Sequence, residues 1–225
     1  MYSQKLTLVI SFIFLTFFLQ QASAELKLPA EARANATTSA ESLGTLEKNM
    51  GLKAGETVPG FTTHTYEGKP VTLAELLNNG PIMVIFYRGG WCPFCNYQVR
   101  QITQAYDKFQ KRNVTPVLIS VDQTDGAMLV KEAYDIPFPV LSDSELAAHE
   151  SFNATIELDN TDYEKYKNYG VDLEAWSGLS HHKIAAPAVF LVSPDSKVLW
   201  SHVAMDFKTR PSVDQLLNVI DNNLK

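Results

Sequence analysis

The sequence predicts an α/β protein in which a mixed central sheet carries helices on both faces, a three-layer sandwich. Strand-like and helix-like segments alternate through the middle of the chain, which is typical of this fold class. The apolar run "IMVIFY" is continuous, as expected for a central strand buried on both faces. The chain ends in a predicted hairpin followed by a helix, and it contains no internal repeat.

Residues 1–24 resemble a signal peptide. Lys5 precedes the 14 residues from Leu6 to Leu19, which are almost all apolar, and "QQASA" ends at Ala24 with small residues at the third and first positions before the break. Fourteen apolar residues are short for a membrane span. We therefore expect cleavage after Ala24, export to the periplasm or the cell exterior, and no stable membrane insertion.

Composition separates the remaining chain into two parts. Residues 25–52 are rich in Ala, Glu, Ser and Thr and hold no aromatic residue, so we expect a partly helical arm. Residues 53–225 have a globular composition and the length of one domain. The formal net charge of the chain is −6, with no basic stripe, and this argues against a nucleic-acid partner.

The first elements of the domain follow from local signals. "VPGFTTHTYEGKPVTL" predicts a hairpin around "EGK". Thr72 and Glu75 have the spacing of a capping box, so "TLAELLNN" begins a short helix. Residues 82–87 are the buried strand, and apolar residues recur at helical spacing from Cys92 to Lys111.

The second half continues the alternation. "VTPVLISV" predicts a strand, "TDGAMLVKEAYD" a helix, "FPVLSD" a strand and "SELAAHESF" a helix. "ATIELD" predicts an extra strand, and "DYEKYKNYG" a short helix that ends at Gly170. "PAVFLV" and "VLWSHVA" predict two strands joined by the turn "PDSK". Ser212 and Gln215 have capping-box spacing and open the last helix, "VDQLLNVIDNN".

The chain has two cysteines, Cys92 and Cys95, in the segment "FYRGGWCPFC". A disulfide between them closes a very small loop and removes little entropy from the unfolded chain, so it stabilises little. Structural stapling is therefore a weak explanation of the pair. Reversible redox chemistry or metal binding explains it better.

The predicted strand-to-helix turn assigns different roles to the two thiols. A thiol reacts as its thiolate, and a helix N-terminus lowers the thiol pKa. Pro93 suits the first helical turn. Cys95 begins the apolar stripe that faces the core, whereas Cys92 lies one turn earlier, at a tip that substrate can reach. We predict that Cys92 attacks, that Cys95 resolves, and that the two form a redox disulfide.

Arg88 lies four residues before Cys92. Its guanidinium either adds positive potential at the thiols or pairs with a carboxylate elsewhere.

These features resemble the thioredoxin superfamily and, more narrowly, peroxiredoxin-like proteins of the alkyl hydroperoxide reductase/thiol-specific antioxidant group. The resemblance rests on "GETVPGFTTHTYEGKPVTLAELL", "FYRGGWCPFC", "FPVLSD", "PAVFLVSPDSKVLW" and "DFKTRPSVDQLL", with Trp91 directly before the motif. It implies a thioredoxin fold and thiol-dependent redox activity. It also implies that Pro187 is cis and faces the active-site sulfurs, the alternative being a trans proline that opens an edge strand.

The sequence departs from typical peroxiredoxins at the motif. Their pattern places Pro and Thr where this chain has Arg88 and Cys92, and their peroxidatic cysteine then aligns with Cys95. The thioredoxin register instead makes Cys92 the nucleophile, and the helix stripe favours that reading. The arginine that typical peroxiredoxins carry before the later strand is missing. Arg88 or Arg210 is a candidate to replace it.

Three functions are compatible with these observations. The first is a thiol peroxidase that reduces hydrogen peroxide or organic hydroperoxides and is regenerated by a thioredoxin-like or other dithiol reductant. The second is an exported thiol–disulfide oxidoreductase acting on protein disulfides. The third is a binding or metal-carrying module, for example a zinc site of both cysteines with His181 and His182. We expect no metal and no cofactor, and the sequence does not indicate an oligomeric state.

Overall fold

The computed structural model describes residues 25–32 and 42–224. The predicted signal peptide, residues 1–24, therefore lies outside the described part of the chain. Residues 42–52 lie along the sheet, where Leu46 forms a parallel bridge with Val203 and the 3₁₀ turn η1 spans Glu47–Asn49. Among the described residues, no helix combines the length and apolar character that crossing a membrane requires.

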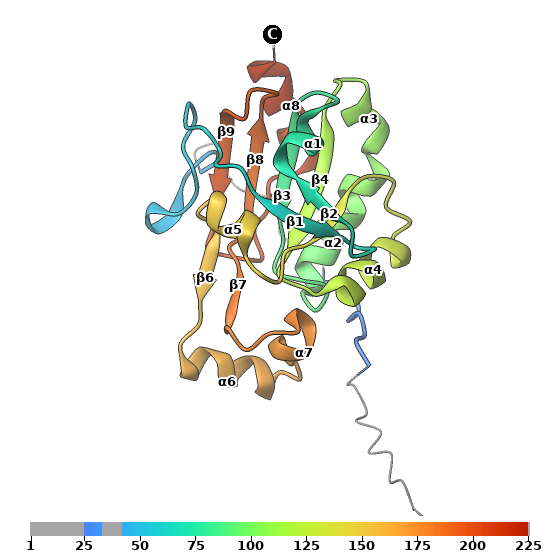
Figure 1. Ribbon diagram of the computed structural model, residues 1–225, viewed down its shortest axis with the longest axis vertical. Helices are drawn as coiled ribbons and strands as arrows, with labels where there is room; N and C mark the ends of the chain where they lie inside the picture. Colours follow the sequence, from blue (N-terminus) through green and yellow to red (C-terminus); the bar gives the residue numbers. More distant parts are fainter. Residues whose placement is uncertain (1–24, 33–41, 225) are drawn as a thin grey trace, which may run out of the picture.

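The core of the fold is a seven-stranded mixed sheet with the order β2-β1-β5-β4-β3-β8-β9 (Figure 1). β3, β4 and β5 are mutually parallel, whereas β8 and β9 continue the sheet antiparallel on one side and β1 and β2 on the other. The strands are β1 (Thr62–Thr65), β2 (Pro70–Thr72), β3 (Ile82–Phe86), β4 (Thr115–Ser120), β5 (Val140–Ser142), β8 (Ala188–Val192) and β9 (Val198–Val203).

Helices cover both faces of this sheet, as the sequence predicts. The helices are α1 (Leu73–Leu77), α2 (Pro93–Gln104), α3 (Tyr106–Gln110), α4 (Thr124–Ala133), α5 (Ala147–Ser151) and α8 (Val213–Asn223). Alternate residues of β3 explain the two layers. Met83 and Ile85 pack with α2, α3, α4 and α8, whereas Val84 and Phe86 pack with α1 and α5. This three-layer arrangement confirms the predicted fold class.

Both predicted capping boxes are present. The Thr72 hydroxyl accepts the N–H of Glu75 while the Glu75 side chain accepts the N–H of Thr72, and Ser212 and Gln215 do the same at α8. These caps satisfy N–H groups that a helix start leaves free. The hairpin around "EGK" is also confirmed, as β1 and β2.

In the middle of the chain one predicted helix is divided, and a predicted extra strand is confirmed in a sheet of its own. The helix expected from Cys92 to Lys111 is divided at Ala105, whose backbone leaves the helical region (φ −103°, ψ 10°). The predicted strand "ATIELD" is β6 (Thr155–Glu157), which pairs with β7 (Lys183–Ala185) in a separate two-stranded sheet. Between them lie α6 (Asn160–Asn168) and the unpredicted α7 (Leu173–Ser177), below the main sheet in Figure 1.

The expectation that Pro187 is cis is wrong, because no peptide bond among the described residues is cis. Pro187 lies directly before β8 and is buried. Its carbonyl accepts the N–H of Ala204 at 3.1 Å, which extends the pairing of β8 with β9. The alternative of a trans proline at the start of a strand therefore holds, although β8 is an inner strand of the sheet.

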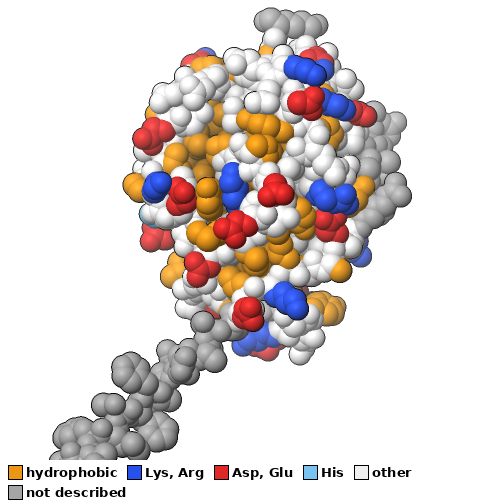
Figure 2. All heavy atoms as spheres, turned by 90° about the vertical axis from the view of Figure 1, so that its right-hand side faces the viewer, with side chains coloured by type: hydrophobic (Ala, Val, Ile, Leu, Met, Phe, Trp, Pro, Cys, Tyr) orange, Lys and Arg blue, Asp and Glu red, His pale blue; other side chains and the backbone are white. Residues whose placement is uncertain are grey.

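The surface mixes charges of both signs. Figure 2 views the side that carries α3 and α4 in Figure 1, and there Lys and Arg side chains lie between Asp and Glu side chains and scattered hydrophobic ones. Such a face has no single-sign field of the kind that draws a polyanion.

Candidate active site

The segment after β3 makes a tight turn that only glycine permits. Gly89 has φ +139°, and a Cβ there would lie 2.4 Å from Nε1 of Trp91 and 2.5 Å from Oδ1 of Asp122. The next residue, Gly90, donates its N–H to Oδ2 of Asp122 at 2.7 Å. Its carbonyl accepts Nδ2 of the buried Asn96 at 2.8 Å. The turn is thus anchored to the end of β4 and to the first turns of α2.

This turn delivers Cys92 to the start of α2. Cys92 is the N-cap residue, Pro93 occupies the first helical turn as predicted, and the N–H of Cys95 points at Sγ of Cys92 at 3.4 Å. The N–H groups of a first helical turn and the helix dipole both favour negative charge at this place. The predicted strand–turn–helix setting of the two thiols is therefore present.

Both sulfurs are buried, with Cys92 1% and Cys95 0% exposed, and both are present as free thiols. The expectation that Cys92 faces solvent is therefore not met. Cys92 instead lines a cavity of about 480 Å³ that opens to the surface beside the exposed Tyr169, whereas Cys95 does not contribute to its wall. Cys92 is consequently the sulfur that a small molecule in this cavity meets.

An arginine from the far end of the chain reaches the inner sulfur. Nη2 of Arg210 lies 3.3 Å from Sγ of Cys95, and Arg210 is only 4% exposed. A buried guanidinium at this distance stabilises a thiolate. Of the two arginines that the sequence offers in place of the missing one, Arg210 contacts Cys95 directly.

The surroundings shift the pKa values of the two thiols in opposite directions. Burial raises the pKa of Cys92 well above its usual value, and the hydrogen bond and negative charge of Cys95 raise it further. Burial also raises the pKa of Cys95, but the hydrogen bond from Cys92 and the charges of Arg210 and Arg88 outweigh it and lower that pKa to about 5. The two shifts have opposite directions and favour the proton on Cys92 and the negative charge on Cys95.

Arg88 lies inside an aromatic enclosure beside Cys92. Its guanidinium carbon lies 4.8 Å from the ring centroid of Trp91, 5.3 Å from that of Tyr166 and 4.1 Å from that of Phe207. Arg88 also donates to the hydroxyl of Tyr166. These residues line the cavity together with Cys92. The charge of Arg88 lowers the pKa of both thiols. Its position therefore supports the prediction that Arg88 adds positive potential at the thiols, and not the alternative of a carboxylate partner elsewhere.

Asp122 is a buried carboxyl on the other side of the turn. It is 0% exposed, and its Oδ1 has no hydrogen-bond partner. Burial raises the pKa of Asp122 to about 7, although the bonds from Gly90 and Ser120 oppose this rise, and the charge of Cys95 adds to it. A group that titrates near neutral pH next to a redox pair is a candidate for a role at the site.

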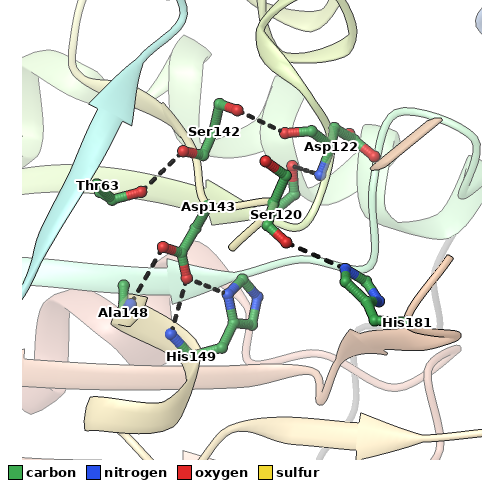
Figure 3. Close-up of polar contacts among 9 residues, drawn as sticks. Thr63, Ser120, Asp122, Ser142, Asp143, Ala148, His149 and His181 are labelled. Atoms are coloured by element: carbon green, nitrogen blue, oxygen red, sulfur yellow. Dashed lines mark hydrogen bonds and ion pairs between the residues drawn. The ribbon is translucent and has the colours of Figure 1, made fainter. Parts of the chain in front are cut away.

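Figure 3 shows polar contacts at the ends of β4 and β5, including those of Asp122. The Ser142 hydroxyl donates to the carbonyl of Asp122 at 2.8 Å, and the Thr63 hydroxyl donates to the carbonyl of Ser142 at 2.7 Å. Next to them, Oδ2 of Asp143 lies 2.6 Å from Nδ1 of His149, and both side chains are buried. Buried hydrogen bonds of this kind hold the backbone in one arrangement.

The predicted residues Cys92, Cys95, Arg88, Trp91 and Pro93 come together at this site. Pro187 does not line the cavity. His181 and His182 contact the Ser144 carbonyl and Glu174 instead of the cysteines. Among the described residues, no group of three or more His, Cys, Asp or Glu side chains is arranged to hold a metal.

Sequence reasoning did not find Asp122, Tyr166 or Phe207. Asp122 follows directly on a predicted strand, and that position was the only signal for it. Tyr166 and Phe207 carry no signal, because α6 and the segment after β9 meet only in the folded chain.

Comparisons with known proteins show what the whole chain is similar to. The model of the AhpC/TSA family matches residues 54–201. A chloroplastic peroxiredoxin Q of Sedum lineare is 35% identical over 89 residues, which are 40% of this chain and 47% of that protein, so the match spans about half of the relative's length. A thiol-disulfide oxidoreductase ResA of Bacillus cereus is 26% identical over 158 residues, 69% of this chain and 73% of that protein.

Solved structures show the same fold. The peroxidoxin BcpB of Mycobacterium tuberculosis has a TM-score of 0.59 at 21% identity and covers 77% of this chain and 98% of its own. Peroxiredoxin Q of Xanthomonas campestris has a TM-score of 0.55 at 18% identity and covers 73% of this chain and 91% of its own. With the family match over most of the domain and a dithiol at the start of α2, the chain belongs to the AhpC/TSA family.

Proposed function

We propose that this protein is a thiol peroxidase that reduces hydrogen peroxide or organic hydroperoxides through Cys92 and Cys95. The observation that carries the proposal is the burial of both sulfurs, of which only Cys92 borders a cavity. A peroxide of modest size fits the space of about 480 Å³ beside Cys92 as the fold stands, whereas any protein partner, substrate or reductant, requires the site to open because Cys92 is 1% exposed.

The first step needs the proton of Cys92 to move to the Cys95 sulfur, to which Cys92 is hydrogen-bonded. Cys92 passes its proton to the Cys95 thiolate, and the Cys92 thiolate attacks one peroxide oxygen. The O–O bond breaks, Cys92 becomes a sulfenic acid, and the leaving oxygen takes a proton from water. The Arg88 guanidinium and the helix start stabilise the negative charge while it is on Cys92.

Cys95 then completes the oxidative half of the cycle. Its sulfur attacks the sulfur of the Cys92 sulfenic acid, the S–S bond forms, and hydroxide leaves as water with the proton from Cys95. A dithiol reductant, for example a thioredoxin-like protein, returns two electrons and two protons. The resemblance of the chain to peroxiredoxin Q supports this cycle, and its resemblance to ResA supports the disulfide chemistry alone.

Single serine variants test the roles. We expect Cys92→Ser to lose peroxide consumption and sulfenic acid formation. In Cys95→Ser we expect each chain to consume one peroxide, which oxidises Cys92 once. This oxidation is slower than in the wild type because the proton acceptor is gone, and no intramolecular disulfide forms. Fast single oxidation of Cys92→Ser would instead make Cys95 the attacking thiolate.

The assay also separates the two enzyme classes. Wild-type protein with a dithiol donor is supplied with hydrogen peroxide, with an alkyl hydroperoxide and, in parallel, with insulin as a protein disulfide. Turnover of a peroxide without reduction of insulin supports the proposal. Reduction of insulin without peroxide turnover would make the protein a thiol–disulfide oxidoreductase.

We also propose that the protein acts after export, because residues 1–24 have the pattern of a signal peptide. N-terminal sequencing of protein isolated from its native cells tests this. A first residue at Glu25 is the expected result, and a mature chain that begins at Met1 would contradict export by cleavage.

A further inference from the structure

One face of α6 lines the cavity at Cys92. Asp162, Lys165, Tyr166 and Tyr169 lie three or four positions apart, so their side chains leave the helix on the same side, and all four belong to the wall of the cavity. Asp162 and Lys165 bond each other at 2.6 Å with largely exposed side chains, and Tyr169 is exposed as well. Tyr166 is half-buried, and it is the hydroxyl of this face that reaches the groups beside Cys92.

Arg88 and Trp91 hold the Tyr166 ring in place. Nη2 of Arg88 donates to the Tyr166 hydroxyl, and the rings of Trp91 and Tyr166 meet edge to face with centroids 5.4 Å apart. Trp91 directly precedes Cys92, and all four residues line the same cavity. The bond from Arg88 occupies a lone pair of the phenol oxygen and leaves its O–H free to donate. The described part of the chain gives that proton no acceptor.

The remainder of the wall offers no comparable proton near Cys92. The guanidinium of Arg88 keeps its protons, because its pKa lies above 12. Burial raises the pKa of Tyr166, the charge of Arg88 opposes this rise, and the charge of Cys92 adds to it, so Tyr166 keeps its proton at neutral pH. The other buried or half-buried wall residues carry no hydroxyl and no acidic group: Trp91, Pro93, Phe94, Leu158, Val171 and Phe207.

We propose that Tyr166 is the general acid of the peroxidase reaction and protonates the oxygen that leaves when the O–O bond breaks. This assignment rests on the proposed function. The Cys92 thiolate attacks one peroxide oxygen, and the electron pair of the O–O bond moves to the other oxygen. That oxygen takes the phenol proton and leaves as an alcohol or as water, while Cys92 becomes the sulfenic acid. Water then returns a proton to the Tyr166 phenolate.

The acidities favour this transfer. A leaving hydroxide or alkoxide is the base of an acid with a pKa of about 16, whereas a phenol has a pKa of about 10. The leaving oxygen therefore takes the proton even though burial raises the pKa of Tyr166. The phenolate that remains lies at the guanidinium of Arg88, which stabilises its charge.

Two oxidants with different leaving groups test the role on the reduced full chain. tert-Butyl hydroperoxide releases an alkoxide, which needs a proton, whereas peracetic acid releases acetate, which is stable without one. We expect Tyr166→Phe to slow oxidation by the hydroperoxide at least about tenfold and oxidation by the peracid less than about twofold. The measurement is the rate at which free thiols disappear after mixing with a limiting amount of oxidant.

Tyr163→Phe is the matched control. Tyr163 lies on the same helix, one turn before Tyr166, and does not line the cavity. The control variant should react with both oxidants as the wild type does.

The possible failures are distinguishable. A Tyr166→Phe variant that reacts with the hydroperoxide as fast as the wild type overturns the role of Tyr166 and leaves the peroxidase function in place. Equal slowing with both oxidants also overturns it, because the hydroxyl would then act only by holding Arg88. A wild-type protein that does not react with the hydroperoxide contradicts the proposed function, and the role of Tyr166 falls with it.

Discussion

Nη2 of Arg210 lies 3.3 Å from Sγ of Cys95, although the two residues are 115 positions apart in the chain. The contact joins the segment before α8 to the first turn of α2 inside the protein. Together with the hydrogen bond from Cys92, it lowers the pKa of Cys95 and so favours negative charge on that sulfur, the one farther from the cavity at Cys92. Cys92 thus lines the cavity, whereas Cys95 lies behind it and is the sulfur at which negative charge is favoured.

Replacing Arg210 with Met is expected to raise the pKa of Cys95 from about 5. An opposite charge at this distance lowers a pKa by about 1–3 units, so its loss shifts the thiolate titration upward by a similar amount. The measurement is thiolate absorbance against pH in reduced protein. Lys208→Met removes a nearby exposed cation as a control and should leave the titration in place. An unshifted curve for Arg210→Met would show that Arg210 does not stabilise the thiolate.

Asp122 is expected to make the protein less stable as pH rises. Its folded pKa of about 7 lies above the unfolded value of about 4, so the folded state binds more protons between these pH values. The stability that the protonated Asp122 contributes is therefore complete at acidic pH and is lost as pH rises from about 4 to about 7. The free energy of unfolding falls by about 1.4 kcal/mol for each pH unit in this range.

The variant Asp122→Asn tests this pH dependence, because its free energy of unfolding can be subtracted from that of the wild type at each pH. The amide oxygen still accepts the N–H of Gly90, but the group no longer titrates. Urea unfolding of both proteins across this pH range should show the variant gaining stability relative to wild type as pH rises. A constant difference in the free energy of unfolding would mean that Asp122 keeps an ordinary pKa.

Asp143→Asn is expected to destabilise the fold by about 3 kcal/mol, because a buried carboxylate that accepts several hydrogen bonds is lost. Asp143 accepts the N–H groups of Ala148 and His149 as well as Nδ1 of His149. Burial raises its pKa, but the bonds from His149 outweigh this and lower it overall. The stability that Asp143 contributes is therefore present above its unfolded pKa and is lost as pH falls through the folded pKa.

An exposed pair gives the comparison for Asp143. Asp162 bonds Lys165 at 2.6 Å, but the two side chains are 51% and 60% exposed. Asp162→Asn should cost less than about 1 kcal/mol in chemical unfolding. Similar losses in the two variants would mean that the Asp143 contacts do not stabilise the fold more than a surface pair does.

Gly89→Ala is expected to disturb the active site and cost more than about 2 kcal/mol, because it combines a positive φ with a steric clash. The new Cβ would lie 2.4 Å from Nε1 of Trp91. Gly170→Ala is the control, since Gly170 also has a positive φ but nothing lies within 4 Å of its added Cβ. The measurements are the unfolding free energy and the rate of thiol oxidation. Equal behaviour of the two variants would show that the turn at Gly89 has room for a side chain.

The sequence by itself determined most strands and helices in their order, though not β7 and α7, together with both capping boxes and the position of the dithiol at the start of a helix. These features depend on periodicity, caps and turn residues, which act over a few neighbouring positions. Pro93 at the first turn of α2 and Thr72 at the cap of α1 are local in this sense.

Only the tertiary structure decided which sulfur holds the charge. The hydrogen bond with Cys92 and the charge of Arg210, which arrives from a distant segment, lower the pKa of Cys95, whereas burial beside Cys95 raises that of Cys92. Burial of both sulfurs, the trans bond before Pro187 and the enclosure of Arg88 by Trp91, Tyr166 and Phe207 likewise depend on how segments pack. Charge stabilisation and desolvation act through space, so the spacing of residues along the chain does not reveal them.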